Sequence, residues 1–192
     1  MTVHNEPLLF NNDTISDDVT VSDDITVSDD ITIPDDVTIF DDVYVREMTE
    51  DDVEEAAVIE GKTFSMPWKA SDFLEMVKAP YAYYFVAEIP QRKIVGIIGL
   101  RDIAGEGEIT NVAVDESYRR LGIGRKLMDA VIDKCDELKI NDITLEVRVS
   151  NVPAIRLYES YGFVSEGVRP NFYEHPTEDA AIYWKRKRRN KN

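Results

Sequence analysis

The feature that most constrains the fold is the segment 112–125, in which a strand, a short loop and the start of a long helix follow one another. Glycines at positions 122 and 124 stand at the helix start, where the lack of a Cβ lets the backbone approach a ligand. The unpaired N–H groups of a helix start point toward an anion. Positive charge is added by Arg119, Arg120 and Arg125. The segment therefore predicts a pyrophosphate cradle, although Gly-x-Gly by itself is also typical of a tight turn.

Residues 43–185 alternate strand and helix signals, which is the pattern of an α/β (α+β) domain. Helices are predicted from a capping pattern at 49, over 71–78, from 123 for about four turns, and from 151 to about 162. Strands are predicted at 43–46, 83–88, 94–100, 108–114, 142–149, about 163–169 and about 179–185. Apolar residues in 142–149 alternate strictly with polar ones, so Thr144, Glu146 and Arg148 share the other face of that strand.

The N-terminal region repeats a six-residue unit five times without a gap, from Thr14 to Val43, with two Asp residues in each copy. A hexapeptide β-helix has this period, but five copies make fewer than two turns of such a coil, and about three stacked units are needed for stability. Repulsion between the Asp pairs also favours disorder. We therefore predict an acidic low-complexity tail over 1–42, an enzyme-like domain over 43–185 and a basic tail over 186–192.

Charge is spread unevenly along the chain, whose formal net charge is −16. Residues 1–42 hold twelve acidic side chains and neither Lys nor Arg, whereas residues 185–192 hold six basic ones. Between them, residues 43–184 carry 26 acidic and 16 basic side chains. An acidic body repels the phosphate backbone, so direct nucleic-acid binding is not expected. The basic end is interpreted as a solvated terminus rather than as a nucleic-acid patch.

The composition also argues against several kinds of site. Cys135 is the only cysteine and there are two histidines, so neither a disulfide framework nor a Cys/His metal site is expected. Cys135 lies among apolar helix positions, which favours a buried structural thiol over a nucleophile. The apolar runs are far below membrane-spanning length, and the N-terminus lacks the regions of a secretion signal. A cytoplasmic, monomeric protein is predicted.

Two motifs resemble the signatures of the GNAT acetyltransferases. Arg119-Arg-Leu-Gly-Ile-Gly124 is similar to that family's Arg/Gln-x-x-Gly-x-Gly/Ala motif and directly follows a strand ending Asn-Val-Ala-Val-Asp. The stretch 151–163 is similar to the second signature, Asn-x-x-Ala-x-x-Leu-Tyr-x-x-x-Gly-Phe. The resemblance implies the GNAT fold, a mixed and mostly antiparallel sheet of six to seven strands flanked by about four helices. It also implies acetyl-CoA as cosubstrate and no metal.

The same resemblance assigns contacts to acetyl-CoA. It implies that the pantetheine arm lies beside the strand ending at Val114, and that an N–H there stabilises the oxyanion of the tetrahedral intermediate. The implied cofactor-binding residues are Val112, Ala113, Val114, Arg119, Arg120, Leu121, Gly122, Ile123, Gly124, Arg125, Asn151, Ala154 and Tyr158.

A closer resemblance is to the RimI branch of that family, the bacterial enzymes that acetylate the N-terminal alanine of small-subunit ribosomal protein 18. It rests on Phe64-Ser-Met-Pro-Trp68 and on the stretches 111–115, 145–151 and 157–163. The resemblance implies that Glu146 is the general base and that Tyr158 protonates the leaving thiolate. Glu108 remains a second candidate base. Without a catalytic role, Glu146 would be a solvent-facing strand carboxylate and Tyr158 a packed aromatic.

The RimI resemblance also places Phe64, Trp68 and Tyr173 around the acceptor peptide, although all three residues could be core aromatics. The role of Arg148 stays open. The predicted acceptor is a basic protein N-terminus, that of a ribosomal protein, because an acidic body attracts a basic chain. A GNAT that acetylates a small-molecule amine and a non-catalytic acetyl-CoA-binding module remain as alternatives. Retention of both Glu146 and Tyr158 argues against the second.

Overall fold

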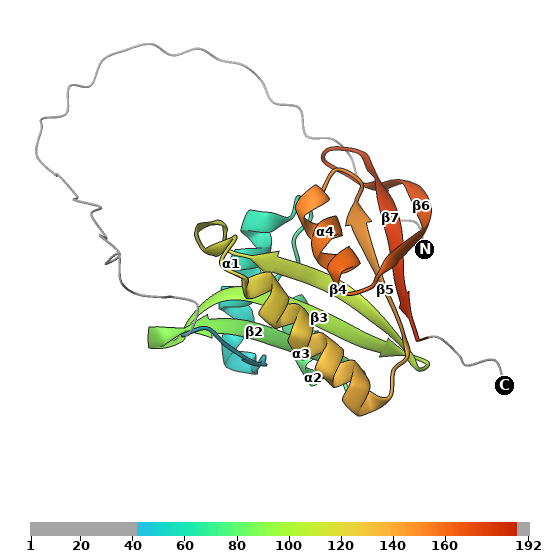
Figure 1. Ribbon diagram of the computed structural model, residues 1–192. Helices are drawn as coiled ribbons and strands as arrows, with labels where there is room; N and C mark the ends of the chain where they lie inside the picture. Colours follow the sequence, from blue (N-terminus) through green and yellow to red (C-terminus); the bar gives the residue numbers. More distant parts are fainter. Residues whose placement is uncertain (1–41, 188–192) are drawn as a thin grey trace, which may run out of the picture. The chain divides into compact units, whose positions relative to one another are not determined.

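The computed structural model describes residues 42–187 of the 192-residue chain (Figure 1). The predicted acidic tail, 1–42, lies outside the described residues except for Asp42, and so does the basic tail, 186–192, except for Arg186 and Lys187. The division of the chain into these three regions therefore stays a prediction.

Seven strands and four α-helices make up the described part of the chain. The strands are β1 (Tyr44–Glu47), β2 (Ala82–Ile89), β3 (Lys93–Ile103), β4 (Glu106–Val114), β5 (Asp142–Arg148), β6 (Val164–Tyr173) and β7 (Glu178–Arg186). The helices are α1 (Val53–Thr63), α2 (Ala70–Lys78), α3 (Ile123–Leu138) and α4 (Val152–Ser160), and three short 3-10 turns are η1 (Glu50–Asp52), η2 (Pro90–Arg92) and η3 (Glu116–Tyr118). Every helix and strand predicted from the sequence is present.

The strands form one sheet in the order β1-β2-β3-β4-β5-β7-β6. Only the β4–β5 pair is parallel, and the others are antiparallel. The predicted mixed, mostly antiparallel sheet with about four helices is therefore confirmed. Strand β6 runs four residues beyond its predicted end. Pro170 lies in this extension; β6 is an edge strand and its register shifts between Arg169 and Tyr173, so a residue without an N–H is accommodated there.

Local sequence explains the elements that frame the candidate site. In β5, Ile143, Leu145 and Val147 are buried while the intervening residues are half-buried, as the strict alternation predicts. The apolar stripe of α3 is buried at Ile123, Leu127, Val131 and Cys135. At the start of α4, the Asn151 side chain accepts a hydrogen bond of 3.2 Å from the Ala154 N–H and caps the helix.

Helices cover both faces of the sheet, and each face has its own apolar core (Figure 1). Buried residues of α3, among them Leu127 and Val131, pack with Tyr158 of α4 against one face. Residues of α1 and α2, among them Ala56 and Phe73, pack against the other. Glu146, on the polar face of β5, therefore lies on the α1/α2 side of the sheet.

The two parallel strands diverge after a short paired stretch. Pairing of β4 with β5 runs from Glu106↔Asp142 to Ile109↔Leu145 and then stops, although β4 continues to Val114 and β5 to Arg148. A register shift in the β3–β4 pairing falls at the same level, where Leu100↔Ile109 is followed by Ile98↔Val112. Figure 1 shows the ends of β4 and β5 separating. Within residues 42–187, the end of β4 thus has one edge without a strand partner.

Candidate active site

The start of α3 has the geometry of an anion cradle. Gly122 occupies the N-cap position with a φ of 75°, a left-handed conformation that glycine adopts without strain. The N–H groups of Arg125 and Lys126 donate to the Gly122 carbonyl oxygen at 2.9 and 3.2 Å, so intrahelical bonding begins only there. The N–H groups of Ile123 and Gly124 precede it and point out of the helix end. The residues present fit a bound phosphate group.

Gly124 has a packing role as well. A Cβ at this position would stand 3.3 Å from Cδ2 of Leu157 in α4, which is closer than most real Cβ contacts. The glycine therefore permits the close approach of α3 and α4. This differs from the sequence interpretation, in which the missing Cβ at 124 served only the ligand, and it means that a bulky replacement would also disturb the helix pair.

The three arginines of the cradle segment have different surroundings. The Nε atom of Arg119 donates to the carbonyl oxygen of Val114 at 3.0 Å, which fastens the loop to the end of β4. Nη1 of Arg125 donates to Oγ of Ser160 at 3.4 Å. Arg120 is exposed and has a φ of 68°. Of the three, only Arg120 has a side chain without a hydrogen bond to another residue within 42–187.

The surroundings of Glu146 shift the pKa of its carboxyl group. One of its oxygens lies 3.0 Å from Nη2 of Arg169 in β6, and its side chain is 24% exposed. Burial raises the pKa of Glu146, the Arg169 charge opposes that shift, and the Glu108 carboxylate adds to it. A carboxyl group with a raised pKa is a stronger base than an ordinary glutamate.

Glu108, the other candidate base, is engaged elsewhere. It is paired in register with Arg101 of β3 across the sheet, and the Arg101 guanidinium donates to a single Glu108 oxygen through both Nε and Nη2. Its carboxylate is therefore held by a neighbouring strand, whereas Glu146 is held by an arginine whose side chain is more than half exposed.

Tyr158 is buried in α4, with 6% of its surface exposed. Its ring lies 6.2 Å from that of Phe163, centroid to centroid. Burial and the nearby Tyr173 phenol raise the pKa of Tyr158, and no hydrogen bond from a described group opposes that shift. The hydroxyl therefore keeps its proton at neutral pH.

Tyr173, at the end of β6, links the two candidate catalytic groups. Burial raises its pKa to about 12, and the charge of Glu146 contributes to the shift. Because Tyr173 in turn raises the pKa of Tyr158, its phenol lies within electrostatic reach of both groups. Tyr173 of β6 thus connects, through charge interactions, Glu146 of β5 on one face of the sheet with Tyr158 of α4 on the other.

The other two predicted acceptor residues pack partly inward. Phe64 follows α1, donates its N–H to the Glu60 carbonyl oxygen at 2.9 Å, and is half-buried against the α1/α2 core. The Trp68 ring lies 5.5 Å from Phe73 and 6.0 Å from Tyr84, centroid to centroid. Both aromatics belong in part to the core, while each keeps some exposed surface in the loop between α1 and α2.

A buried carboxyl group at the end of α1 is not singled out by the sequence. Glu60 is 2% exposed, its Oε1 accepts a bond of 2.7 Å from Nδ2 of Asn111, and its Oε2 has no partner among the described residues. Asn111 also accepts a hydrogen bond of 3.4 Å from the Tyr84 hydroxyl. The sequence signal that could have indicated this burial is the position of Glu60 on the same helix face as the apolar residues Val53 and Ala56.

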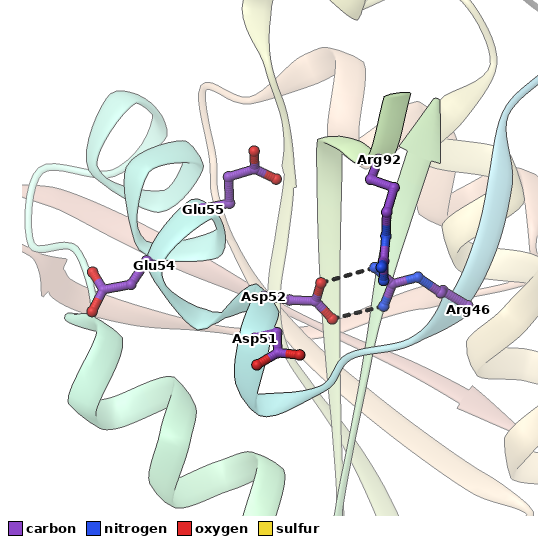
Figure 2. A pocket seen from close by; sticks show the side chains of 6 residues that line it. All are labelled: Arg46, Asp51, Asp52, Glu54, Glu55 and Arg92. Atoms are coloured by element: carbon purple, nitrogen blue, oxygen red, sulfur yellow. Dashed lines mark hydrogen bonds and ion pairs between the residues drawn. The ribbon is translucent and has the colours of Figure 1, made fainter. Parts of the chain in front are cut away.

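A hollow at the start of α1 is lined by Arg46, Asp51, Asp52, Glu54, Glu55 and Arg92 (Figure 2). Arg46 donates to both oxygens of Asp52, at 2.7 and 2.8 Å, and this pairing lowers the pKa of Asp52 to about 2. None of the predicted site residues lines this hollow. Its ion pairs attach β1 to the start of α1.

Two further findings concern residues 42–187 alone. They contain no group of three or more His, Cys, Asp or Glu side chains arranged to hold a metal ion. Within the same residues, no helix has both the length and the apolar character needed to cross a membrane. Cys135 is buried in α3, as predicted for a structural thiol. The monomeric state and the cytoplasmic location stay predictions.

Comparison with known proteins identifies the family. Residues 45–163 match the Acetyltransferase (GNAT) family. The ribosomal protein bS18-alanine N-acetyltransferase of Escherichia coli strain K12 is 31% identical over 135 residues, which are 70% of this chain and 88% of that protein. A provisionally named enzyme of the same kind from Bacillus subtilis strain 168 is 36% identical over 141 residues, 73% of this chain and 93% of that protein.

The fold agrees with a solved relative. The crystal structure of the ribosomal-protein-S18-alanine N-acetyltransferase from Escherichia coli gives a TM-score of 0.70 at 28% identity, covering 78% of this chain and 97% of that one. The predicted resemblance to the RimI branch is thereby confirmed. With a family match over more than half of its length and relatives aligned over more than two thirds of it, this protein belongs to the GNAT family of N-acetyltransferases.

Proposed function

We propose that this enzyme transfers the acetyl group of acetyl-CoA to the N-terminal α-amine of a protein, the N-terminal alanine of small-subunit ribosomal protein 18. The observation that carries the proposal is that the Tyr173 phenol lies within electrostatic reach of both Glu146 and Tyr158. Glu146 lies on β5 just beyond the point where the pairing with β4 stops. The names of the bacterial relatives support the choice of acceptor.

Acetyl-CoA is proposed to bind along α3 and β4. The N–H groups at the start of α3, with Gly122 and Gly124, are assigned to the pyrophosphate, and Arg120 supplies a side chain for a phosphate oxygen. The edge of β4 at residues 112–114 no longer pairs with β5 and is assigned to the pantetheine arm. Asn151 and Ala154, in the cap of α4, are assigned to the same arm.

Acetyl transfer on this site needs one base and one acid. The neutral amine nitrogen attacks the thioester carbonyl carbon, a backbone N–H near Val114 stabilises the oxyanion, and Glu146 takes the proton lost by the amine. Collapse of the tetrahedral intermediate breaks the C–S bond, and the thiolate takes the proton of the Tyr158 hydroxyl. The raised pKa of Glu146 suits its role because it strengthens the base, and the Tyr158 hydroxyl is protonated at neutral pH.

The acceptor is assigned to the α1/α2 side of the sheet. Glu146 faces that side, and Phe64 and Trp68 pack against the core on the same side. Residues 43–184 are acidic overall, which favours encounter with a basic chain such as a ribosomal protein. An enzyme for small amines would need no such long-range complementarity, and it remains the alternative.

The experiment compares kcat/KM for an Ala-Arg-Tyr-led peptide, its Ala-Glu-Glu counterpart and a free polyamine at low and high salt, with mass spectrometry to place the acetyl group. The expected result is acetylation of the α-amine of the basic peptide, with a kcat/KM that falls as salt rises. A higher kcat/KM for the acidic peptide or the polyamine than for the basic peptide would refute the proposed acceptor, while leaving acetyl transfer itself in place. Binding of acetyl-CoA without turnover of any amine would favour a non-catalytic module.

A further inference from the structure

Two loops on the acceptor side of the sheet come from distant parts of the chain. The first, 64–69, joins α1 to α2, and the second, 174–177, joins β6 to β7. They touch directly, because the Ser65 hydroxyl donates to the Glu174 carbonyl oxygen at 3.0 Å. The residues that flank this contact, Phe64 on one side and Tyr173 on the other, are both proposed acceptor residues. Whatever fixes the two loops together therefore shapes the acceptor site.

Arg148, the last residue of β5, lies between the two loops and bonds to both. Its hydrogen bonds run from Nη2 to Ser65 Oγ at 3.2 Å and to Glu174 O at 3.0 Å, and from Nη1 to Pro176 O at 3.0 Å and to Glu178 Oε2 at 3.1 Å. The guanidinium carbon also lies 4.4 Å from the centre of the Tyr173 ring. One side chain thus ties β5, both loops and an aromatic residue of the site.

These contacts are sheltered and mutually supported. The side chains of Arg148 and Glu178 are 22% and 17% exposed, respectively. The other oxygen of Glu178 accepts the Ser150 N–H at 2.7 Å, so this carboxylate also joins β7 to the connection between β5 and α4. The Ser150 and Arg148 hydrogen bonds lower the pKa of Glu178, which keeps it charged and able to hold the arginine.

We propose that Arg148 is a positioning residue: it locks the loops 64–69 and 174–177 together and holds the Tyr173 ring in place for the acceptor amine. This inference rests on the proposed function, because it assumes that the two loops receive the acceptor. A guanidinium suits the task because its two terminal nitrogens present donors in a planar fork and its face stacks on an aromatic ring. A lysine has the charge but neither the fork nor the flat face.

The β6–β7 hairpin, whose connecting loop is 174–177, contains an arginine that serves as a matched control. Arg186 of β7 donates to both oxygens of Glu166 in β6, with the shortest contact at 2.9 Å, and its guanidinium lies 3.9 Å from the centre of the Trp184 ring. This arginine therefore has a carboxylate partner and an aromatic platform as Arg148 does. It pairs opposite Asp142, at the other end of β5, and touches neither loop.

The first test is kinetic, on Arg148→Lys, Ser65→Ala, the double variant and Arg186→Lys. For Arg148→Lys we expect the acceptor KM to rise about tenfold with the acetyl-CoA KM unchanged, because hydrogen bonds to a charged group are lost only on the acceptor side. Ser65→Ala should raise the acceptor KM less, and the rise in the double variant should be smaller than the product of the two single rises, since both changes break the hydrogen bond between Arg148 and Ser65. Arg186→Lys should behave as wild type.

The second test is hydrogen exchange on the free enzyme, which needs no acceptor. Arg148→Lys should speed amide exchange in both loops, whereas Arg186→Lys should not. If exchange in the loops does not change, or changes equally in the control, Arg148 does not lock them and the inference is wrong. A rise in the acetyl-CoA KM equal to that of the acceptor would also overturn it. If exchange responds as expected while wild type acetylates no peptide, the proposed function fails and the loop lock stands.

Discussion

The buried carboxyl group of Glu60 should make the stability of this protein depend on pH in an unusual direction. Burial raises its pKa from 4.5 to about 7, against the opposing effect of the hydrogen bond from the Asn111 amide. The folded protein therefore holds this proton over a pH range in which the unfolded chain has released it. Most carboxylates stabilise a fold by ionising, whereas ionisation of this one is opposed by the fold.

The size and sign of this pH effect on the free energy of unfolding follow from the difference between the folded and unfolded pKa values of Glu60. Between the unfolded pKa of 4.5 and the folded value of about 7, the native state binds more protons than the unfolded state, so the free energy of unfolding falls as pH rises. Each pKa unit corresponds to about 1.4 kcal/mol, which gives a loss of about 3 kcal/mol once the pH exceeds the folded value. Below the unfolded pKa the penalty vanishes.

Glu60→Gln removes this titration while keeping the shape of the side chain and an oxygen for Asn111. We expect the variant to equal wild type near pH 4.5 and to exceed its unfolding free energy by about 3 kcal/mol at pH 8, measured by urea denaturation at a series of pH values. Glu54→Gln, on the exposed side of the same helix, is the matched control and should follow wild type. A stability difference that stays flat from pH 5 to 8, or a Gln variant that is weaker at every pH, would refute the reasoning.

Four further outcomes test the proposed site. Tyr158→Phe should lower kcat by about 10² to 10⁴ with unchanged acetyl-CoA affinity by calorimetry, because it removes only the proton donor. Glu146→Gln should lower kcat/KM most at low pH, where less of the acceptor amine is neutral, as a pH profile would show. Arg169→Ala should move the acidic limb of that profile to higher pH, since the Arg169 charge lowers the pKa of Glu146. Gly124→Val should weaken acetyl-CoA binding and lower Tm together, because the valine side chain would crowd Leu157. For each of the four variants, wild-type values in its assay would contradict the role assigned to that residue.

Much of the fold could be predicted because it is specified by local patterns. Strict alternation in 142–149 places Glu146 on the polar face of β5, and the glycines at 122 and 124 mark the start of α3. The Asn151 cap follows from residue type and position alone. These features depend on neighbours within one or two turns, so a single sequence contains the information. The extra length of β6 was not predicted, because a strand accommodates a residue such as Pro170 only where it lies at the edge of a sheet.

Only the tertiary structure decided which side chains meet across the sheet. The hydrogen bond from Asn111 to Glu60 joins residues 51 positions apart, and the one from Arg148 to Ser65 joins residues 83 apart. No periodicity links such pairs, because their contact depends on how α1 and the loop after it pack on the sheet. The sequence by itself determined the elements, the cradle and the family resemblance. The tertiary structure decided that Glu60 is buried with an unpartnered oxygen and that Arg148 bonds two loops, because burial and long-range hydrogen bonds exist only once the elements are packed.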